Sequence, residues 1–180
     1  SILGIDTPDI RESLSKISIY NESKQLRELA AGALSNIGAI DAKIFRNVLQ
    51  KGPIKYKTTA LQSGIAIGKP MAQVMNDSLF PLLDTLHENI FQLTCFVLVK
   101  IDPESKRLTD KLFRILRDRS FSNSMAGNAG YALARINGRK IIPRLKSLFD
   151  LSDPSKKFLC MRIMHILRAM EDPGDKMVPD

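Results

Sequence analysis

Residues 125–149 read MAGNAGYALARINGRKIIPRLKSLF. Small and apolar residues fill the first part of this stretch at helical spacing, Asn137-Gly138 indicates a tight turn, and an amphipathic segment follows. The stretch therefore predicts a helix, a turn and a second helix. Because segments of the same kind recur along the chain, this pattern indicates the fold of the whole sequence.

The recurrence is clearest in the second helix of each predicted pair. Counted back from the last apolar residue of that helix, apolar or small side chains occur at 11, 7, 4, 3 and 0 residues, which forms one stripe of a helix with 3.6 residues per turn. These last residues follow one another at intervals of 30, 34, 35 and 34, and they are Ile37, Ile67, Ile101, Ile136 and Met170. A near-constant period of this length is typical of a helical-repeat architecture.

First helices of the pairs are predicted from start signals and apolar spacing. The first one follows Thr7-Pro8-Asp9, where Thr7 is expected as the N-cap and Pro8 as the first helical residue. The others are predicted at residues 41–49, 71–86, 106–117 and 140–149, of which 71–86 is either unusually long or split. Pro81 and Pro143 should mark a first turn or a kink. Since no segment alternates with period two for long enough to form a strand, we expect an all-α fold.

The stretches from Ala31 to Gly38 and from Ile142-Pro143-Arg144-Leu145 to Asp153 resemble HEAT repeats, especially the short type found in bacterial HEAT-like and phycobilisome-lyase-like proteins. The resemblance implies a HEAT-like α-solenoid of about five helix pairs that forms a right-handed superhelix and lines its concave side with the second helices. It also implies a single repeat domain over residues 1–180. The expected units are 8–38, 39–68, 69–102, 103–138 and 139–172, followed by a tail at 173–180.

Charge is unevenly distributed along the chain. The net charge is +8, of which residues 1–90 contribute +1 (10 Lys and Arg against 9 Asp and Glu) and residues 91–180 contribute +7 (17 against 10). This asymmetry predicts an acidic partner for the C-terminal half. No apolar run approaches the roughly 18 residues of a membrane span. Cys95 and Cys160 lie in apolar helical stretches and are expected as buried thiols in a cytoplasmic protein.

Positions one, five and eight residues before each last apolar residue point away from the core stripe, and we expect them on the concave side. These positions are small and neutral in the first units and become basic and aromatic in the last ones. The predicted binding residues are Lys100, Tyr131, Arg135, Arg162, His165 and Arg168. Arg168 lies two positions before the last apolar residue of its helix and flanks the same face. Because the chain begins with Ser1 and lacks a signal peptide, we expect it to be a segment of a longer protein.

Catalytic and metal-binding patterns are weak. His87-Glu88 is similar to one of the His-Glu pairs that hold a di-iron centre in a HEAT-like hydroxylase, but such a centre needs four pairs and the chain has two His. Residues 63–70 (SGIAIGKP) have the wrong spacing for a phosphate-binding loop. We therefore predict no catalytic residue, no metal and no cofactor, while a lyase-type accessory role stays open.

The predicted function is that of a non-enzymatic scaffold, which presents a basic C-terminal concave surface to an acidic protein segment. The alternative is a nucleic-acid-binding HEAT-like module that contacts phosphates without glycosylase chemistry. The last second helix, LCMRIMHILRAM at residues 159–170, is strongly apolar, and additional repeats or a subunit are expected to pack on it.

Overall fold

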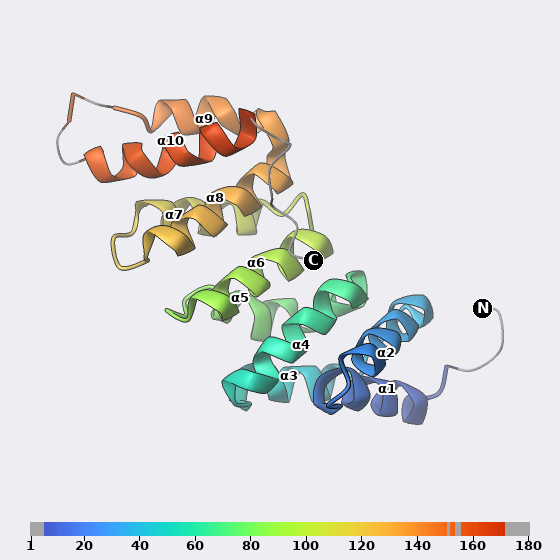
Figure 1. Cartoon of the computed structure of the whole chain (residues 1–180). Helices are drawn as coiled ribbons and strands as arrows, with labels where there is room; N and C mark the ends of the chain where they lie inside the picture. Colours follow the sequence, from blue (N-terminus) through green and yellow to red (C-terminus); the bar gives the residue numbers. More distant parts are fainter. Residues whose placement is uncertain (1–5, 151, 154–155, 172–180) are drawn as a thin grey trace. The chain divides into compact units, whose positions relative to one another are not determined.

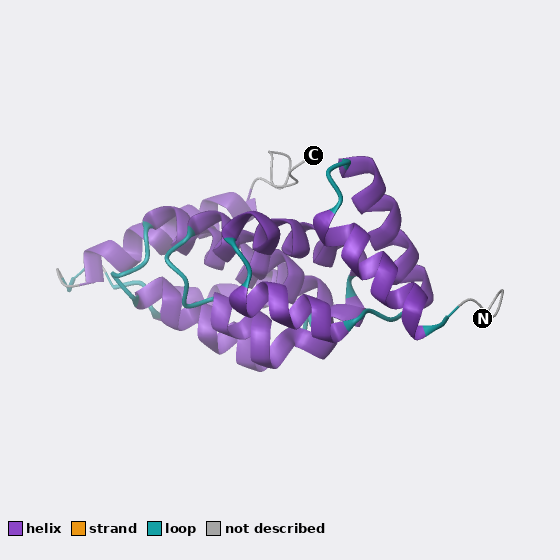
Figure 2. Ribbon diagram, turned by 90° about the horizontal axis from the view of Figure 1, so that it is seen from below, coloured by secondary structure: helices purple, strands orange, loops and turns teal. Residues whose placement is uncertain are grey.

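A computed structural model describes residues 6–150, 152–153 and 156–171 of the chain. It is 80% helical, and the described residues contain no strand, which confirms the all-α prediction (Figure 2). The chain divides into two compact units, residues 1–102 and 103–180, and the division falls at a predicted repeat boundary. The expectation of one continuous repeat domain stays a prediction, and the predicted tail at 173–180 lies outside the described residues.

Helices α2 (Lys24–Ile37), α4 (Ile54–Ile67) and α6 (Glu88–Ile101) form one layer of the first unit. α4 packs against both α2 and α6, and Figure 1 shows the three helices in sequence order. The second layer contains α1 (Pro8–Tyr20) and α3 (Ala42–Lys51), which both contact α4. Side chains between the layers are fully buried, among them Leu34, Phe45, Leu49, Leu61, Met71 and Phe91.

Capping residues begin and end these helices, and the cap at Thr7 is the predicted one. The Thr7 side chain accepts a hydrogen bond from the Ile10 amide at 3.3 Å at the start of α1, and Pro8 is its first residue. Asp41 caps α3 by accepting from the amides of Lys43 and Ile44. Gly38 ends α2 with a φ of 76°, a left-handed conformation that glycine adopts without steric cost.

A polar contact joins two helices in the core of the first unit. Ser63, on α4, occupies a position of the apolar stripe and is only 6% exposed. Its hydroxyl donates to the carbonyl of Ser18 on α1 at 2.5 Å, and the Ser18 hydroxyl donates to the Ser15 carbonyl. The Ser15 hydroxyl accepts from the Asp41 amide at 3.0 Å. These small side chains are therefore satisfied inside the core, where an unpaired hydroxyl would be costly.

The predicted helix at 71–86 is split. The structure has a 3₁₀ helix at Lys69–Val74, a π-helical turn at Met75–Leu79 and a short α5 at Phe80–Leu82. Pro81 prevents a continuous α-helix, because its ring removes one backbone donor and crowds the preceding turn. Contacts from α3 hold the irregular backbone: Arg46 pairs with Asp77 at 2.5 Å, and Gln50 donates to the Asp77 carbonyl at 2.9 Å.

The second unit consists of α7 (Lys106–Arg117), α8 (Asn123–Asn137), a 3₁₀ turn at Gly138–Ile141, α9 (Ile142–Ser147) and α10 (Lys157–Glu171). α8 packs against both α7 and α10. The helix predicted at 140–149 is shorter than expected, because residues 138–141 form the 3₁₀ turn and Pro143 lies in the first turn of α9. All second helices are found within one residue of their predicted ends, since α2, α4, α6, α8 and α10 end at residues 37, 67, 101, 137 and 171.

Gly130 permits a close approach between α8 and α10. A Cβ atom added at Gly130 would lie 2.2 Å from two side-chain carbons of Ile166 on α10. Ile166 is itself only 4% exposed, so its side chain has little room to move. Gly127, one turn earlier on α8, has no neighbouring atom within 4 Å of such a Cβ.

We expect Gly130→Ala to lower the free energy of unfolding by about 1–3 kcal/mol, because the added methyl group overlaps Ile166. Gly127→Ala is the matched control and should raise it by about 0.5–1 kcal/mol, since alanine is the better helix former and nothing obstructs it. Urea denaturation followed by circular dichroism measures both. Equal effects of the two substitutions would contradict the close approach at Gly130.

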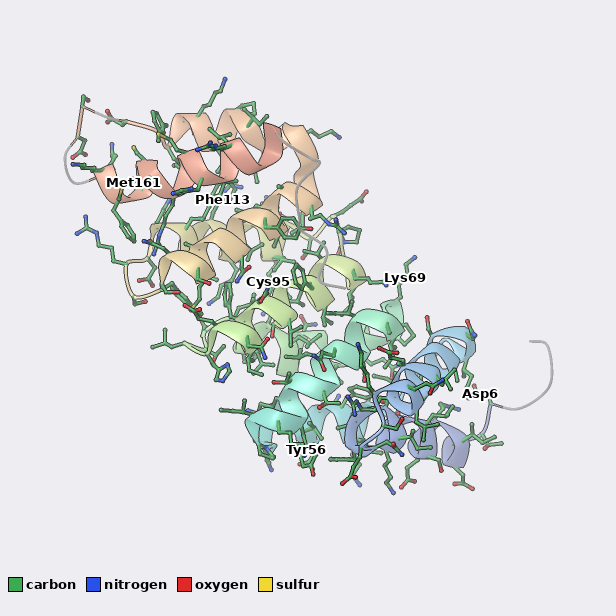
Figure 3. The ribbon with its side chains drawn as sticks, in the orientation of Figure 1. Asp6, Tyr56, Lys69, Cys95, Phe113 and Met161 are labelled. Atoms are coloured by element: carbon green, nitrogen blue, oxygen red, sulfur yellow. The ribbon has the colours of Figure 1, made fainter. Side chains whose placement is uncertain are left out.

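Both cysteines are free and buried, as predicted. Cys95 lies within α6 (Figure 3), and burial raises the pKa of its thiol above the usual value. Because both sulfur atoms are buried, we expect neither cysteine to react rapidly with a thiol reagent in the native protein. Two thiols should become titratable in denaturant, and rapid reaction of either one without denaturant would contradict the packing.

Candidate functional site

The predicted binding residues divide between the two units. Lys100 lies at the end of α6 in the first unit, whereas the other five lie on α8 and α10 in the second. Arg135, His165 and Arg168 are exposed, as is Lys100, and Tyr131 is half-buried. The remaining residue, Arg162, does not lie on an open surface.

Arg162 is 5% exposed and is enclosed by polar backbone groups. Its Nη1 donates to the carbonyl oxygens of Leu116 at 3.0 Å and Asp118 at 2.9 Å. Its Nη2 donates to the Phe121 carbonyl, and its Nε donates to the side chain of Asn123 at 3.3 Å. The guanidinium therefore joins α10 to the turn between α7 and α8, and it supplies donors to carbonyl groups at the C-terminal end of α7.

An aromatic ring supports the same side chain. The Arg162 Cζ lies 3.8 Å from the centre of the Phe158 ring, a cation–π distance. Burial lowers the pKa of Arg162, whereas the negative charge of Asp118 acts in the opposite direction. The pKa of Asp118 is itself lowered, first by hydrogen bonds from Ser120 and to a smaller extent by Arg162.

The structure thus corrects the prediction that Arg162 faces a ligand. Helical periodicity alone leaves position 162 at the edge of the buried face of α10, and a long basic side chain there is normally expected to reach solvent. The deciding partners are backbone carbonyls about 40 residues away, whose positions depend on the α7–α8 turn. Local signals of the turn are Asp118, whose side chain accepts a hydrogen bond from the Ser120 amide, and Ser122, which is the N-cap of α8.

Tyr131 and Arg135 are brought together on α8. They are four residues apart, and the Arg135 Cζ lies 5.6 Å from the centre of the Tyr131 ring. This contact keeps the guanidinium close to an aromatic face while leaving its donors available. Within the described part of the chain, no carboxylate forms an ion pair with Arg135.

His165 and Arg168 lie together on the outward face of α10. The exposed residues of this helix that share that face are Lys157, Met161, Met164, His165 and Arg168. They are spaced at i, i+4, i+7, i+8 and i+11, which places them along one side of a helix, and we call them the α10 stripe. Its charged members have no ion pair to any described residue.

Lys100 borders an open depression in the first unit, with a volume of about 680 Å³. The depression lies at the C-terminal ends of α2, α4 and α6, and its lining residues include Ser35, Gly38, Gly68, Lys69, Gln73 and Lys100. The stem of Lys100 passes over Gly68, whose φ is 73°. Figure 3 labels Lys69 beside α4. The two ammonium groups offset the partial negative charge of the helix ends and can also receive a carboxylate.

Charge follows the division into units. Residues 1–102 carry 11 Lys and Arg against 10 Asp and Glu, a net charge of +1, whereas residues 103–180 carry 16 against 9, a net charge of +7. Some of the excess is paired inside the second unit. Arg144, for example, contacts Asp110 at 2.9 Å and lies 4.0 Å from the ring centre of Phe113. Arg135, Lys157 and Arg168 belong to the part of this charge that is exposed. Further exposed basic residues of the second unit are Lys106, Arg114, Arg117, Lys140 and Lys146.

The described residues contain no group of three His, Cys, Asp or Glu that could hold a metal ion. His87 is the N-cap of α6, and its Nδ1 accepts a hydrogen bond from the Ile90 amide at 3.5 Å. Among the described helices, none is long and apolar enough to cross a membrane.

Arg162→Met should lower the free energy of unfolding by about 3 kcal/mol, because buried carbonyls of the α7–α8 turn lose their donors. Arg162→Lys should retain only part of the stability, since a single ammonium group cannot replace the fork of donors. Arg168→Met is the matched control on the same helix, with an expected change within about 0.5 kcal/mol. Urea denaturation measures the free energy of unfolding of each variant. Equal values for Arg162→Met and Arg168→Met would contradict a structural role for Arg162.

No protein-family model matches the chain, and no curated protein matches it either.

Proposed function

We propose that the chain is a non-enzymatic HEAT-like scaffold whose second unit binds an acidic protein segment. The observation that carries the proposal is the set of exposed basic side chains on α8 and α10. Arg135 and Arg168 are exposed, and no described carboxylate forms an ion pair with either of them.

The repeat architecture supports the scaffold part of the proposal. The second helices α2, α4, α6, α8 and α10 have 14 or 15 residues each and recur at a near-constant interval. α2 packs against α1 and α4, α4 packs against α3 and α6, and α8 packs against α7 and α10. Stacked helix pairs of this kind form a right-handed solenoid in HEAT proteins, and such solenoids present extended surfaces to partners.

Electrostatics supports an acidic partner. A net charge of +7 over residues 103–180 raises the local concentration of anions and accelerates their association. Exposed guanidinium groups bind carboxylates through paired hydrogen bonds. The two buried free thiols agree with a reducing compartment such as the cytoplasm.

A nucleic-acid-binding module is the alternative, because phosphate contacts require only Arg and Lys. The observation in its favour is the same excess of basic residues. We favour a protein partner because exposed Met161 and Met164 interrupt the basic surface of α10. A phosphate backbone offers no apolar surface that could bury the two exposed thioether side chains, whereas a protein segment can bury them.

The experiment compares a fluorescent Glu-rich peptide with a DNA duplex of equal net charge, each titrated with the full chain at roughly 50 and 200 mM salt. We expect the peptide to bind more tightly than the duplex at both salt concentrations. Arg135→Glu combined with Arg168→Glu should weaken peptide binding about tenfold or more, since attraction becomes repulsion at two positions.

Lys43→Glu combined with Lys55→Glu is the matched control, because it makes the same charge change at two exposed positions of the first unit and should alter the affinity by less than about twofold. Tighter binding of the duplex, with a steep loss of affinity at higher salt, would establish the nucleic-acid alternative. Failure of both ligands to bind at the lower salt concentration would refute the proposal.

A further inference from the structure

The α10 stripe combines apolar and basic side chains in a regular order. Met161 is 47% exposed and Met164 is 53% exposed, whereas Cys160, Ile163 and Ile166 on the opposite side of the helix are buried. Lys157 lies before the methionines, and His165 and Arg168 lie beside and after them. The stripe is about 17 Å long, given the 1.5 Å rise per helical residue.

A shallow hollow continues the apolar part of the stripe. It has a volume of about 330 Å³ and is lined by Arg119, Lys157, Phe158 and Met161. Met161 is labelled on α10 in Figure 3. The ring of Phe158 lies under the Arg162 guanidinium and 5.8 Å from the Arg119 Cζ. The contacts of Arg162 therefore fix the position of the Phe158 ring, which lines the hollow. The hollow is thus present in the chain without a partner.

Methionine suits such a surface. Its unbranched thioether side chain adapts its shape to different apolar partners, and methionines are enriched at surfaces that bind amphipathic helices. Two exposed methionines one turn apart, together with the neighbouring hollow, form a continuous apolar strip rather than isolated exposed residues. A partner that buries this strip must supply apolar side chains at matching spacing.

Charge decides which partner fits. Residues 157–168 contain Lys157, Arg162, His165 and Arg168 and no Asp or Glu. A second copy of this chain would place a second basic stripe against the first, which like-charge repulsion disfavours. An acidic segment places carboxylates beside Lys157 and Arg168 and thereby satisfies both the apolar and the charged groups.

We propose that the α10 stripe binds an acidic amphipathic helix, whose bulky apolar side chains pack on Met161 and Met164. This inference rests on the proposed function, because it specifies what kind of acidic segment the second unit recognises. The straight stripe matches a helix lying alongside α10, with apolar residues at i, i+3, i+4 and i+7 of the partner.

The test uses two fluorescent acidic peptides of equal length and charge, one with leucines at those four positions and one with serines there. We expect the full chain to bind the leucine peptide about tenfold or more tightly than the serine peptide, because the leucines bury the methionine side chains. Met161→Ser combined with Met164→Ser should abolish that preference. Leu26→Ser combined with Leu29→Ser, which changes two exposed apolar residues of α2, should leave the preference unchanged.

Methyl NMR of the methionines gives an independent readout. The leucine peptide should shift the methyl signals of Met161 and Met164, while those of Met71 and Met125, which are 0% and 1% exposed, should stay in place. Equal, salt-sensitive binding of both peptides would overturn the inference and leave the proposed function intact. Failure of both peptides would overturn the proposed function as well.

Other occupants of the stripe give different results. If a second copy covered it, the free chain would sediment as a dimer, and the Met161 and Met164 methyl groups would be shielded from a soluble paramagnetic probe before peptide is added. If nucleic acid covered it, a DNA duplex would shift both methyl signals and displace the leucine peptide. Either result would overturn the inference.

Discussion

Burial of one apolar stripe on each second helix is the constraint on which the rest of the structure depends. α2, α4 and α8 each contact their own first helix and a neighbouring second helix, so their buried faces must be broad and closely packed. Small residues make this possible where helices approach most closely, as Gly130 does beneath Ile166. The outward faces are free of this constraint, and their composition can serve recognition.

Arg162 shows how the packing requirement limits the number of basic residues available to a partner. Most residues of the α7–α8 turn are exposed, but carbonyl groups on its inner side face the buried part of α10 and need donors there. A single guanidinium provides several donors in a fixed geometry, and its plane packs on Phe158. One positive charge is thereby used for stability, and the neighbouring Lys157, His165 and Arg168 stay at the surface.

The two units differ in what their surfaces offer. The first unit is nearly neutral, and its open depression places Lys69 and Lys100 at helix C-termini, where their charges offset the helix dipoles. The second unit carries most of the net charge and the exposed methionines of α10. Coulomb attraction over such a surface acts at long range and favours fast association, whereas burial of methionine side chains acts only at contact and favours a particular sequence. Together they account for both the attraction and the selectivity of the proposed site.

The sequence alone determined the all-α class, the positions of the second helices and the burial of both cysteines. Apolar periodicity reports these features directly, because a stripe of 3.6-residue spacing can be buried only by a helix. Capping at Thr7, Asp41 and Gly38 was also predictable, since these contacts form within a few residues along the chain. The sequence left the segment at 71–86 as one long helix or a split one, and only the tertiary structure decided that it is split. Only the tertiary structure showed that Arg162 is buried. Both depend on partners distant in sequence: Arg46 and Gln50 for the backbone at Asp77, and carbonyl groups of the α7–α8 turn for Arg162. A long side chain such as that of Arg162 can reach either solvent or a distant carbonyl group, and the position of that carbonyl decides between them. Apolar periodicity along one helix carries no information about that position.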